Sequence, residues 1–259
     1  MSQRVEDAFA PAQDTIDWAE DAIRELNASA VAFFQGDIAA VITEQDPQTG
    51  ENVQKLRLTQ ALPRIFRRRA TEALTQAKVA LDQATFAVRN LSSGPSRKSI
   101  YFPWAENPTD LERLLIAREI DQRFWETISA HEPYPRSEGH AGGDDVIRAL
   151  AAIANNKHTI GLMVGGHISS TSFPSIVGRE VQSMSISAPR WDPLKNEAEL
   201  LRWVGDVKVD GDYRFAFEVL LKEPRLTQPV NLVDGLGAFA SKAKAVTKDL
   251  KARCIELGL

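Results

Sequence analysis

Apolar residues recur at steps of three and four along two long stretches of the chain, the spacing that lines one face of an α-helix. The first stretch covers about 13–34, where Asp14 is the predicted N-cap and Gly36 ends the helix. The second covers about 63–90 and is rich in alanine. Because small side chains let helix axes approach closely, this second helix is expected to pack against a partner helix.

A β-hairpin is predicted between these two helices. Its arms are 38–44 and 53–58, and the turn between them runs from Asp46 to Gly50. Pro47 presets the backbone angle φ, and Gly50 accepts a positive φ, so this segment has the composition of a tight turn.

The rest of the chain divides into a helical part and a part rich in strands. Further helices are predicted at about 109–120, 122–130 and 144–156. Strands are predicted at 160–168, 183–187, 199–204 and 214–221, and a last helix at about 233–257. A run of helices followed by a run of strands favours an α+β fold over a parallel α/β fold. We therefore predict a helical bundle packed on an antiparallel sheet, with a C-terminal helix.

The predicted elements are assigned to a single α+β domain over 1–259. Its parts are a helical half at about 1–157 with the hairpin inserted at 37–60, a β-rich half at about 158–225 and the C-terminal helix at about 233–257. The hairpin could join the later strands in one sheet, and that arrangement would wrap both halves of the chain around one core.

Composition and charge narrow the classes of partner. Hydrophobic residues make up 43% and charged residues 25% of the chain, the ordinary balance of a globular protein. The formal net charge of -4 gives no global attraction to nucleic acid or to an anionic membrane, so a nucleic-acid role would need a local basic patch. No stretch approaches 18 apolar residues and the N-terminus does not look like a signal peptide, so no membrane partner is expected.

Cysteine and histidine usage bears on the compartment and on metals. With Cys254 alone, no intrachain disulfide can form, which favours a reducing, cytoplasmic location. His131 and His140 lie near Asp144 and Asp145 in the sequence, but their spacing matches no known ligand pattern. Solvated loop residues are the preferred interpretation, and we expect neither a metal nor another cofactor.

A polar cluster ends the helix predicted at 144–156. His158 continues the apolar face of that helix, and Asn155 lies three residues before it, within contact distance on a helix. In a functional interpretation His158 and Lys157 act as acid, base or phosphate contact. Alternatively these residues cap the helix, since Asn favours helix ends and cations suit the negative end of the dipole.

Lys78 and Asp82 lie four residues apart on the alanine-rich helix. They could face the cluster around His158 from a neighbouring helix, which gives a candidate catalytic set of His158, Lys157, Asp82 and Lys78. The alternative is an ordinary pair on a helix surface, which contributes about 0.3 kcal/mol. The deciding quantity is the separation of His158 and Asp82, because more than about 10 Å exceeds direct or water-bridged contact.

The densest basic run begins the same helix. At helical spacing Arg64, Arg67 and Arg68 share a face, which could bind phosphate. The alternative is a solvated face balanced by acidic residues of the first helix, namely Asp17, Glu20 and Asp21. No aromatic residues alternate with the arginines, which argues against RNA recognition by stacking.

Several short motifs along the chain resemble those of an uncharacterised bacterial protein family. The matching stretches are Glu44–Gly50, Ala80-Leu81-Asp82, Phe102-Pro103, Pro133-Tyr134 and Lys157-His158. The resemblance covers most of the chain. It departs from the family pattern at Lys78, where arginine is usual, at Ala154, where asparagine is usual, and at Asn156, where aspartate is usual.

The helical half is also loosely similar to HEPN domains, some of which are metal-independent ribonucleases that use an arginine and a histidine of one helix. Here Arg148 and His158 are ten residues apart, too far for that motif. Two functions are therefore expected. The first is a non-enzymatic helical binding or oligomerisation module, with a possible homodimer through helix faces. The alternative is a HEPN-like ribonuclease or RNA-binding protein.

Overall fold

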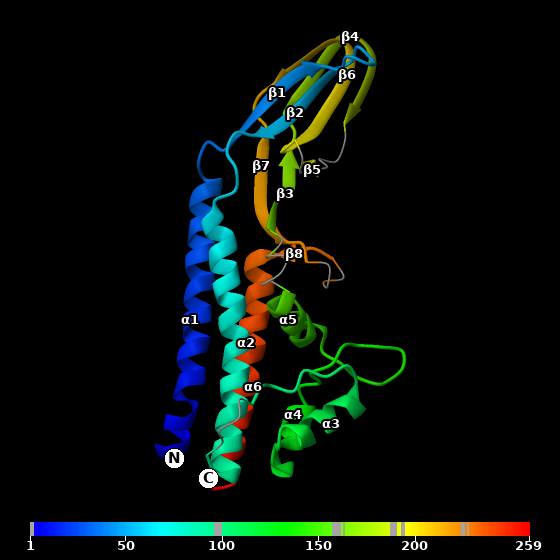
Figure 1. The fold of residues 1–259 in the computed structure, drawn as a ribbon. Helices are drawn as coiled ribbons and strands as arrows, with labels where there is room; N and C mark the ends of the chain where they lie inside the picture. The colour runs from blue at the N-terminus through cyan, green and yellow to red at the C-terminus, as the bar shows by residue number, and fades with distance from the viewer. Residues whose placement is uncertain are drawn as a thin grey trace. The chain divides into compact units, whose positions relative to one another are not determined.

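The computed structural model describes residues 3–95, 100–156, 162, 164–186, 191–192, 195–223, 226 and 228–259. Its helices are α1 (Gln3–Phe34), α2 (Arg64–Ser93), α3 (Pro108–Ala117), the 3-10 helix η1 (Gln122–Phe124), α4 (Trp125–Ser129), α5 (Asp145–Asn156) and α6 (Leu232–Glu256). Its strands are β1 (Ala39–Gln45), β2 (Asn52–Leu58), β3 (Val164–Ser172), β4 (Ser175–Ile186), β5 (Trp191–Asp192), β6 (Glu197–Asp210), β7 (Arg214–Leu221) and β8 (Val230–Asn231). The predicted α+β class, with its antiparallel sheet and C-terminal helix, is confirmed (Figure 1).

The described residues fall into two compact units. The helical unit comprises Met1–Asn27, Arg67–Met163 and Leu221–Leu259, and the strand unit comprises Ala28–Phe66 and Val164–Leu220. The assignment of the chain to a single folding domain stays a prediction.

In the helical unit, α1 and α2 run antiparallel (Figure 1), and ion pairs join α6 to α1. The hydroxyl of Thr15 donates to Oε1 of Gln83 at 2.8 Å, which places these two residues at the same level. Lys244 of α6 forms an ion pair with Glu20 of α1 at 2.7 Å. The alanine-rich face of α2 is buried, as the predicted close helix packing requires.

Helix α1 begins ten residues earlier than predicted. Val5, Phe9 and Ala12 are buried and extend the apolar face, so Asp14 lies inside the helix and is not its N-cap. Pro11 lies inside this helix, where a proline removes a hydrogen bond and costs about 3 kcal/mol. Burial of the apolar side chains on both sides of Pro11 offsets this cost.

In the strand unit, the predicted hairpin of β1 and β2 joins a sheet with the later strands. Strand β2 pairs antiparallel with β6, with Leu56 opposite Ala198, and the strand order is β1-β2-β6-β4. The expectation that hairpin and later strands share one sheet is therefore confirmed. Strand β4 is longer than predicted because the register shifts at Arg179 and Gln182 break the alternation that sequence patterns rely on.

The strand unit has its own hydrophobic core on one face of this sheet. Leu56 of β2 and Leu201 of β6 are almost fully buried there, with Trp203 beside them. Phe173 and Tyr213 pack against this cluster, and their rings meet edge to face. In neither unit is any described helix long and apolar enough to cross a membrane.

Candidate functional site

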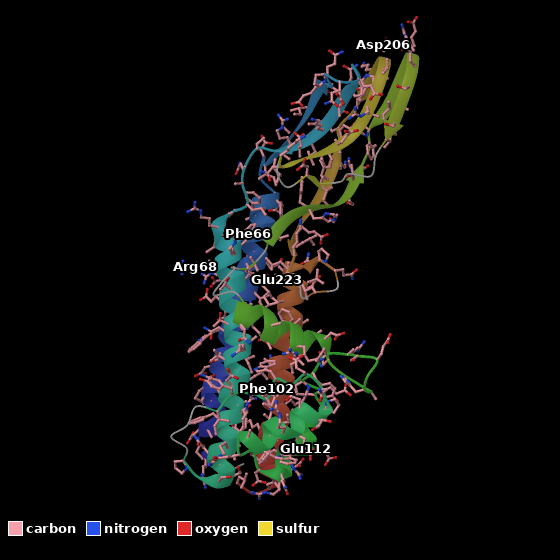
Figure 2. The ribbon with its side chains drawn as sticks, turned by 45° about the vertical axis from the view of Figure 1, so that its right-hand side comes forward. Phe66, Arg68, Phe102, Glu112, Asp206 and Glu223 are labelled. Carbon is pink, nitrogen blue, oxygen red and sulfur yellow. The ribbon has the colours of Figure 1, made fainter. Side chains whose placement is uncertain are left out.

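Asp82, a predicted catalytic residue, lies in the middle of α2 with its side chain only 14% exposed. Its Oδ2 atom accepts from Nζ of Lys78 at 3.1 Å, so the structure brings these two predicted residues together. Its Oδ1 atom accepts from the backbone N–H of Phe102 at 2.9 Å (Phe102 is labelled in Figure 2). Both carboxylate oxygens therefore have partners, and the hydrogen bond from Phe102 fixes that segment against α2.

Further cationic and aromatic groups surround this pair. Nζ of Lys78 lies 5.9 Å from the centroid of the Tyr101 ring, a cation–π distance. Arg118, at the end of α3, is half-buried, and burial lowers its pKa while the charge of Asp82 opposes that shift. Arg118 could not be predicted as a neighbour of Asp82, because no spacing rule links the end of α3 to α2. The arrangement neutralises the Asp82 carboxylate and holds it in place.

The remaining catalytic candidates lie at the end of α5. Asn155 is exposed in the last turn of that helix, whereas Lys157 and His158 lie outside the described residues. The separation of His158 and Asp82 is thus not described, and the catalytic set stays a prediction. Arg148, the arginine of the HEPN comparison, forms an ion pair with Glu106.

The predicted basic face is exposed on α2, as Arg68 illustrates (Figure 2). The acidic residues of α1 were expected to balance the charge of these arginines, but the ion pairs of two of them are formed elsewhere. Glu20 pairs with Lys244 of α6, and Asp21 pairs with Arg24. Arg69, which follows the predicted set of Arg64, Arg67 and Arg68, instead pairs with Glu25 of α1 and Glu72 of α2.

The residues considered as metal ligands have structural partners. Asp144 accepts from the backbone N–H groups of residues 146 and 147 as the predicted N-cap of α5, and His140 packs edge to face on Tyr134. Nε2 of His131 lies 3.1 Å from Oδ2 of Asp249 on α6. Within the described ranges, no three His, Cys, Asp or Glu side chains are grouped so that they could hold a metal ion.

An ion-pair network of the strand unit was also missed by sequence analysis. The Glu197 side chain is only 8% exposed, and its carboxylate accepts from Lys55 at 3.0 Å and from Arg57 at 2.8 Å. Burial alone would raise the pKa of Glu197, but the hydrogen bonds from Arg57 and Lys55 bring it below its usual value. Glu44 of β1 accepts from the same two cations. The charges compensate one another, which is typical of a structural network.

A groove about 440 Å³ in volume opens between α1 and α2. Ala8 and Pro11 line its α1 side, and Phe86, which is 37% exposed, lines its α2 side. Arg4 lies at the end of the groove nearer the N-terminus. Ala8 and Pro11 leave the space open because neither has a long side chain.

Trp18 projects from the same face of α1 and is 57% exposed. Seven residues make nearly two helical turns, so Trp18 and Pro11 share a face about 10 Å apart along the axis. A large apolar side chain and an apolar hollow therefore lie next to each other on one surface, which we call the α1/α2 face (Trp18, Ala8, Pro11 and Phe86). A sequence signal for it existed, because Trp18 falls outside the buried stripe of its helix.

Comparison of the chain with protein-family models, with curated proteins and with solved structures gives no match. The resemblances to a bacterial family and to HEPN domains therefore stay predictions.

Proposed function

We propose that this protein is a non-enzymatic interaction module that forms a homodimer through the α1/α2 face. The observation that carries the proposal is the exposure of Trp18 beside the apolar groove. Contiguous exposed apolar surface of this kind marks interaction sites more often than isolated apolar residues do. The use of both Asp82 oxygens in structural hydrogen bonds supports a non-enzymatic role for the centre of α2.

The α1/α2 face is self-complementary. If two copies meet with their α1 helices antiparallel, a two-fold axis near residue 13 places Trp18 of each copy over the hollow at Ala8 and Pro11 of the other. A two-fold interface requires this reciprocity, in which the same patch serves both subunits. Phe86 then forms a side wall of each tryptophan pocket.

Charge supports the same arrangement. The two-fold axis brings Arg4 of one copy opposite residue 22 of the other. The carboxylates of Asp21 and Glu25 lie beside that position on α1. The side chains of Asp21 and Glu25 are both more than half exposed, so a second cation can reach them. Because such surface pairs are screened by salt, they would set the orientation more than the affinity.

Magnitudes indicate a dimer of moderate affinity. Burying the exposed half of one tryptophan contributes about 3 kcal/mol, and the symmetry doubles that figure. Association itself costs about 4–15 kcal/mol, so the rest of the face must contribute as well. We therefore expect a dissociation constant on the order of micromolar rather than nanomolar.

Sedimentation velocity of the full chain over a concentration series tests the proposal. The wild type should shift from monomer to dimer, and Trp18→Ser should remain a monomer. Ile116→Ser is the matched control, because Ile116 is also a large exposed side chain of the helical unit but lies on α3. A monomeric wild type at all concentrations, or equal dissociation of both variants, would overturn the proposal.

We also propose that the protein resides in the cytoplasm. Cys254 is its one cysteine, and it is buried in α6, where burial raises the pKa of its thiol to about 12. A buried thiol without a second cysteine to pair with is typical of a reducing compartment. A fused reporter that is active only in the cytoplasm should be active, and a silent reporter on a stably expressed fusion would contradict the location.

A further inference from the structure

A second groove of the helical unit lies between α5 and the first half of α6, with a volume of about 540 Å³. Ala149 and Ala152 of α5 line one wall, and Ala238 and Phe239 of α6 line the other. The volume is within the range of about 300–1,000 Å³ typical of small-molecule sites. The groove shares no lining residue with the α1/α2 face.

Two guanidinium groups and two carboxylates, those of Glu106 and Asp145, lie at the edge of this groove. Asp145 already accepts from the backbone N–H of Arg136 at 3.0 Å. Arg148 of α5 forms an ion pair with Glu106, whose side chain is 67% exposed. Arg136 donates from Nε to the backbone carbonyl of Gly143 at 3.1 Å, and none of the described residues accepts a hydrogen bond from its Nη atoms. The two arginines thus present donors to whatever occupies the groove.

The ion pair of Arg148 is replaceable. Only Glu106 is well solvated, because its side chain is 67% exposed and that of Arg148 is 22% exposed. The Glu106 carboxylate can therefore turn into water, while the Arg148 guanidinium stays at the groove. A ligand carboxylate is fixed by the burial of its own apolar part, so it can take the place of the exposed Glu106 carboxylate. Arginine also binds carboxylates through two parallel hydrogen bonds, a geometry that a single ammonium group cannot offer.

We propose that this groove binds a small carboxylic acid with an unbranched apolar chain. The carboxylate binds Arg148 and Arg136, and the chain lies along the alanine-lined walls toward Phe239. The two arginines select the acid group, and the alanine and phenylalanine side chains of the walls select an apolar tail over a compact polar metabolite. This binding site is independent of the proposed dimer.

Isothermal titration calorimetry with decanoate tests this inference on the full chain. We expect one saturable site per chain for the wild type. Decanol, which has the same chain without the charge, should bind at least about tenfold more weakly, as expected for loss of charged hydrogen bonds. Equal affinity for decanol would mean adventitious hydrophobic binding and would overturn the proposal, as would the absence of a saturable site.

Variants locate the site. Arg148→Gln should weaken decanoate binding at least about tenfold, and Ala152→Leu, which fills the groove, should abolish it. Arg113→Gln is the matched control, because Arg113 is an exposed arginine paired with Asp110 on α3. Trp18→Ser should bind decanoate like the wild type, which separates this result from the fate of the dimer. Unchanged binding by both groove variants, with circular dichroism showing that they are folded, would overturn the assignment.

Discussion

The carboxylate of Asp82 accepts a hydrogen bond from the backbone N–H of Phe102 at 2.9 Å, across twenty residues of sequence. This bond joins the middle of α2 to the segment that leads into α3. Phe102 itself is fully buried, and its ring packs edge to face on Trp104 at 4.9 Å between centroids. Asp82 therefore supports the packing of an aromatic segment that has no regular secondary structure of its own.

The first prediction concerns this support. Asp82→Ala should lower the free energy of unfolding by about 2–3 kcal/mol, because it leaves the partly buried N–H of Phe102 without its charged acceptor. Lys78→Met should cost less than about 1 kcal/mol, since Lys78 is partly exposed and contributes a single ion pair. Urea denaturation of both variants measures the difference. A fully stable Asp82→Ala variant would instead favour a functional role for this carboxylate.

Helix α2 could be predicted from the sequence, but the hydrogen bond between Asp82 and Phe102 could not. The alanine-rich stripe predicts α2 closely, because helical periodicity is a local property of the sequence. The partner of Asp82 is a backbone group twenty residues away, and no residue pattern encodes such a contact. The lysine four residues before Asp82 was predicted as its partner because that distance is fixed within one helix.

In the strand unit, too, the local element was predictable and the long-range contact was not. The turn from Asp46 to Gly50 predicts the hairpin of β1 and β2 by its local composition. Glu197 meets Lys55 and Arg57 only because β6 pairs with β2 in one particular register, about 140 residues further along the chain. That register is set by a shared core face, so the ion-pair network could not be predicted before the pairing was known.

The second prediction tests this network. Glu197→Ala should destabilise the strand unit by about 1–3 kcal/mol. This is less than the cost of removing one partner of a fully buried ion pair, because Glu44 still neutralises Lys55 and Arg57. The lowered pKa of Glu197 means that its stabilisation is present above the unfolded pKa of about 4.5 and is lost as the pH falls through the lower folded value. Denaturation of wild type and variant at pH 7 and pH 3 should give a smaller difference at pH 3. An equal difference at both values would contradict the ionic origin.

The third prediction concerns pH and the helical unit. Burial and the nearby charge of Lys242 lower the pKa of His131, against the opposite effects of Asp249 and Asp144. The unfolded chain then binds this proton more readily than the folded one, so stability falls as the pH drops below about 6.5. In His131→Gln the decline in stability from pH 7 to pH 5.5 should be shallower than in the wild type. Parallel curves from thermal denaturation across this range would show that His131 does not contribute to it.

The fourth prediction gives the proposed dimer a geometric test. A two-fold axis near residue 13 places position 14 of one copy about 3 Å along the helix axis from the same position of the other. Asp14 is exposed, so Asp14→Cys should be joined covalently to its partner by a short bis-maleimide reagent, and denaturing electrophoresis should show the dimer band. Cys254 is buried in α6 and therefore should not react under native conditions.

Asp7→Cys is the matched control for this cross-link. Asp7 is also an exposed aspartate of α1, but the same axis separates its two copies by about 18 Å along the helix, beyond the reach of a short reagent. Cross-linking of Asp14→Cys should also disappear when Trp18→Ser is added, because the indole is the group that seats one copy on the other. Equal cross-linking at positions 7 and 14 would indicate random collision. Efficient cross-linking at position 7 alone would place the two-fold axis elsewhere and reject the pairing of Trp18 with the groove at Ala8 and Pro11.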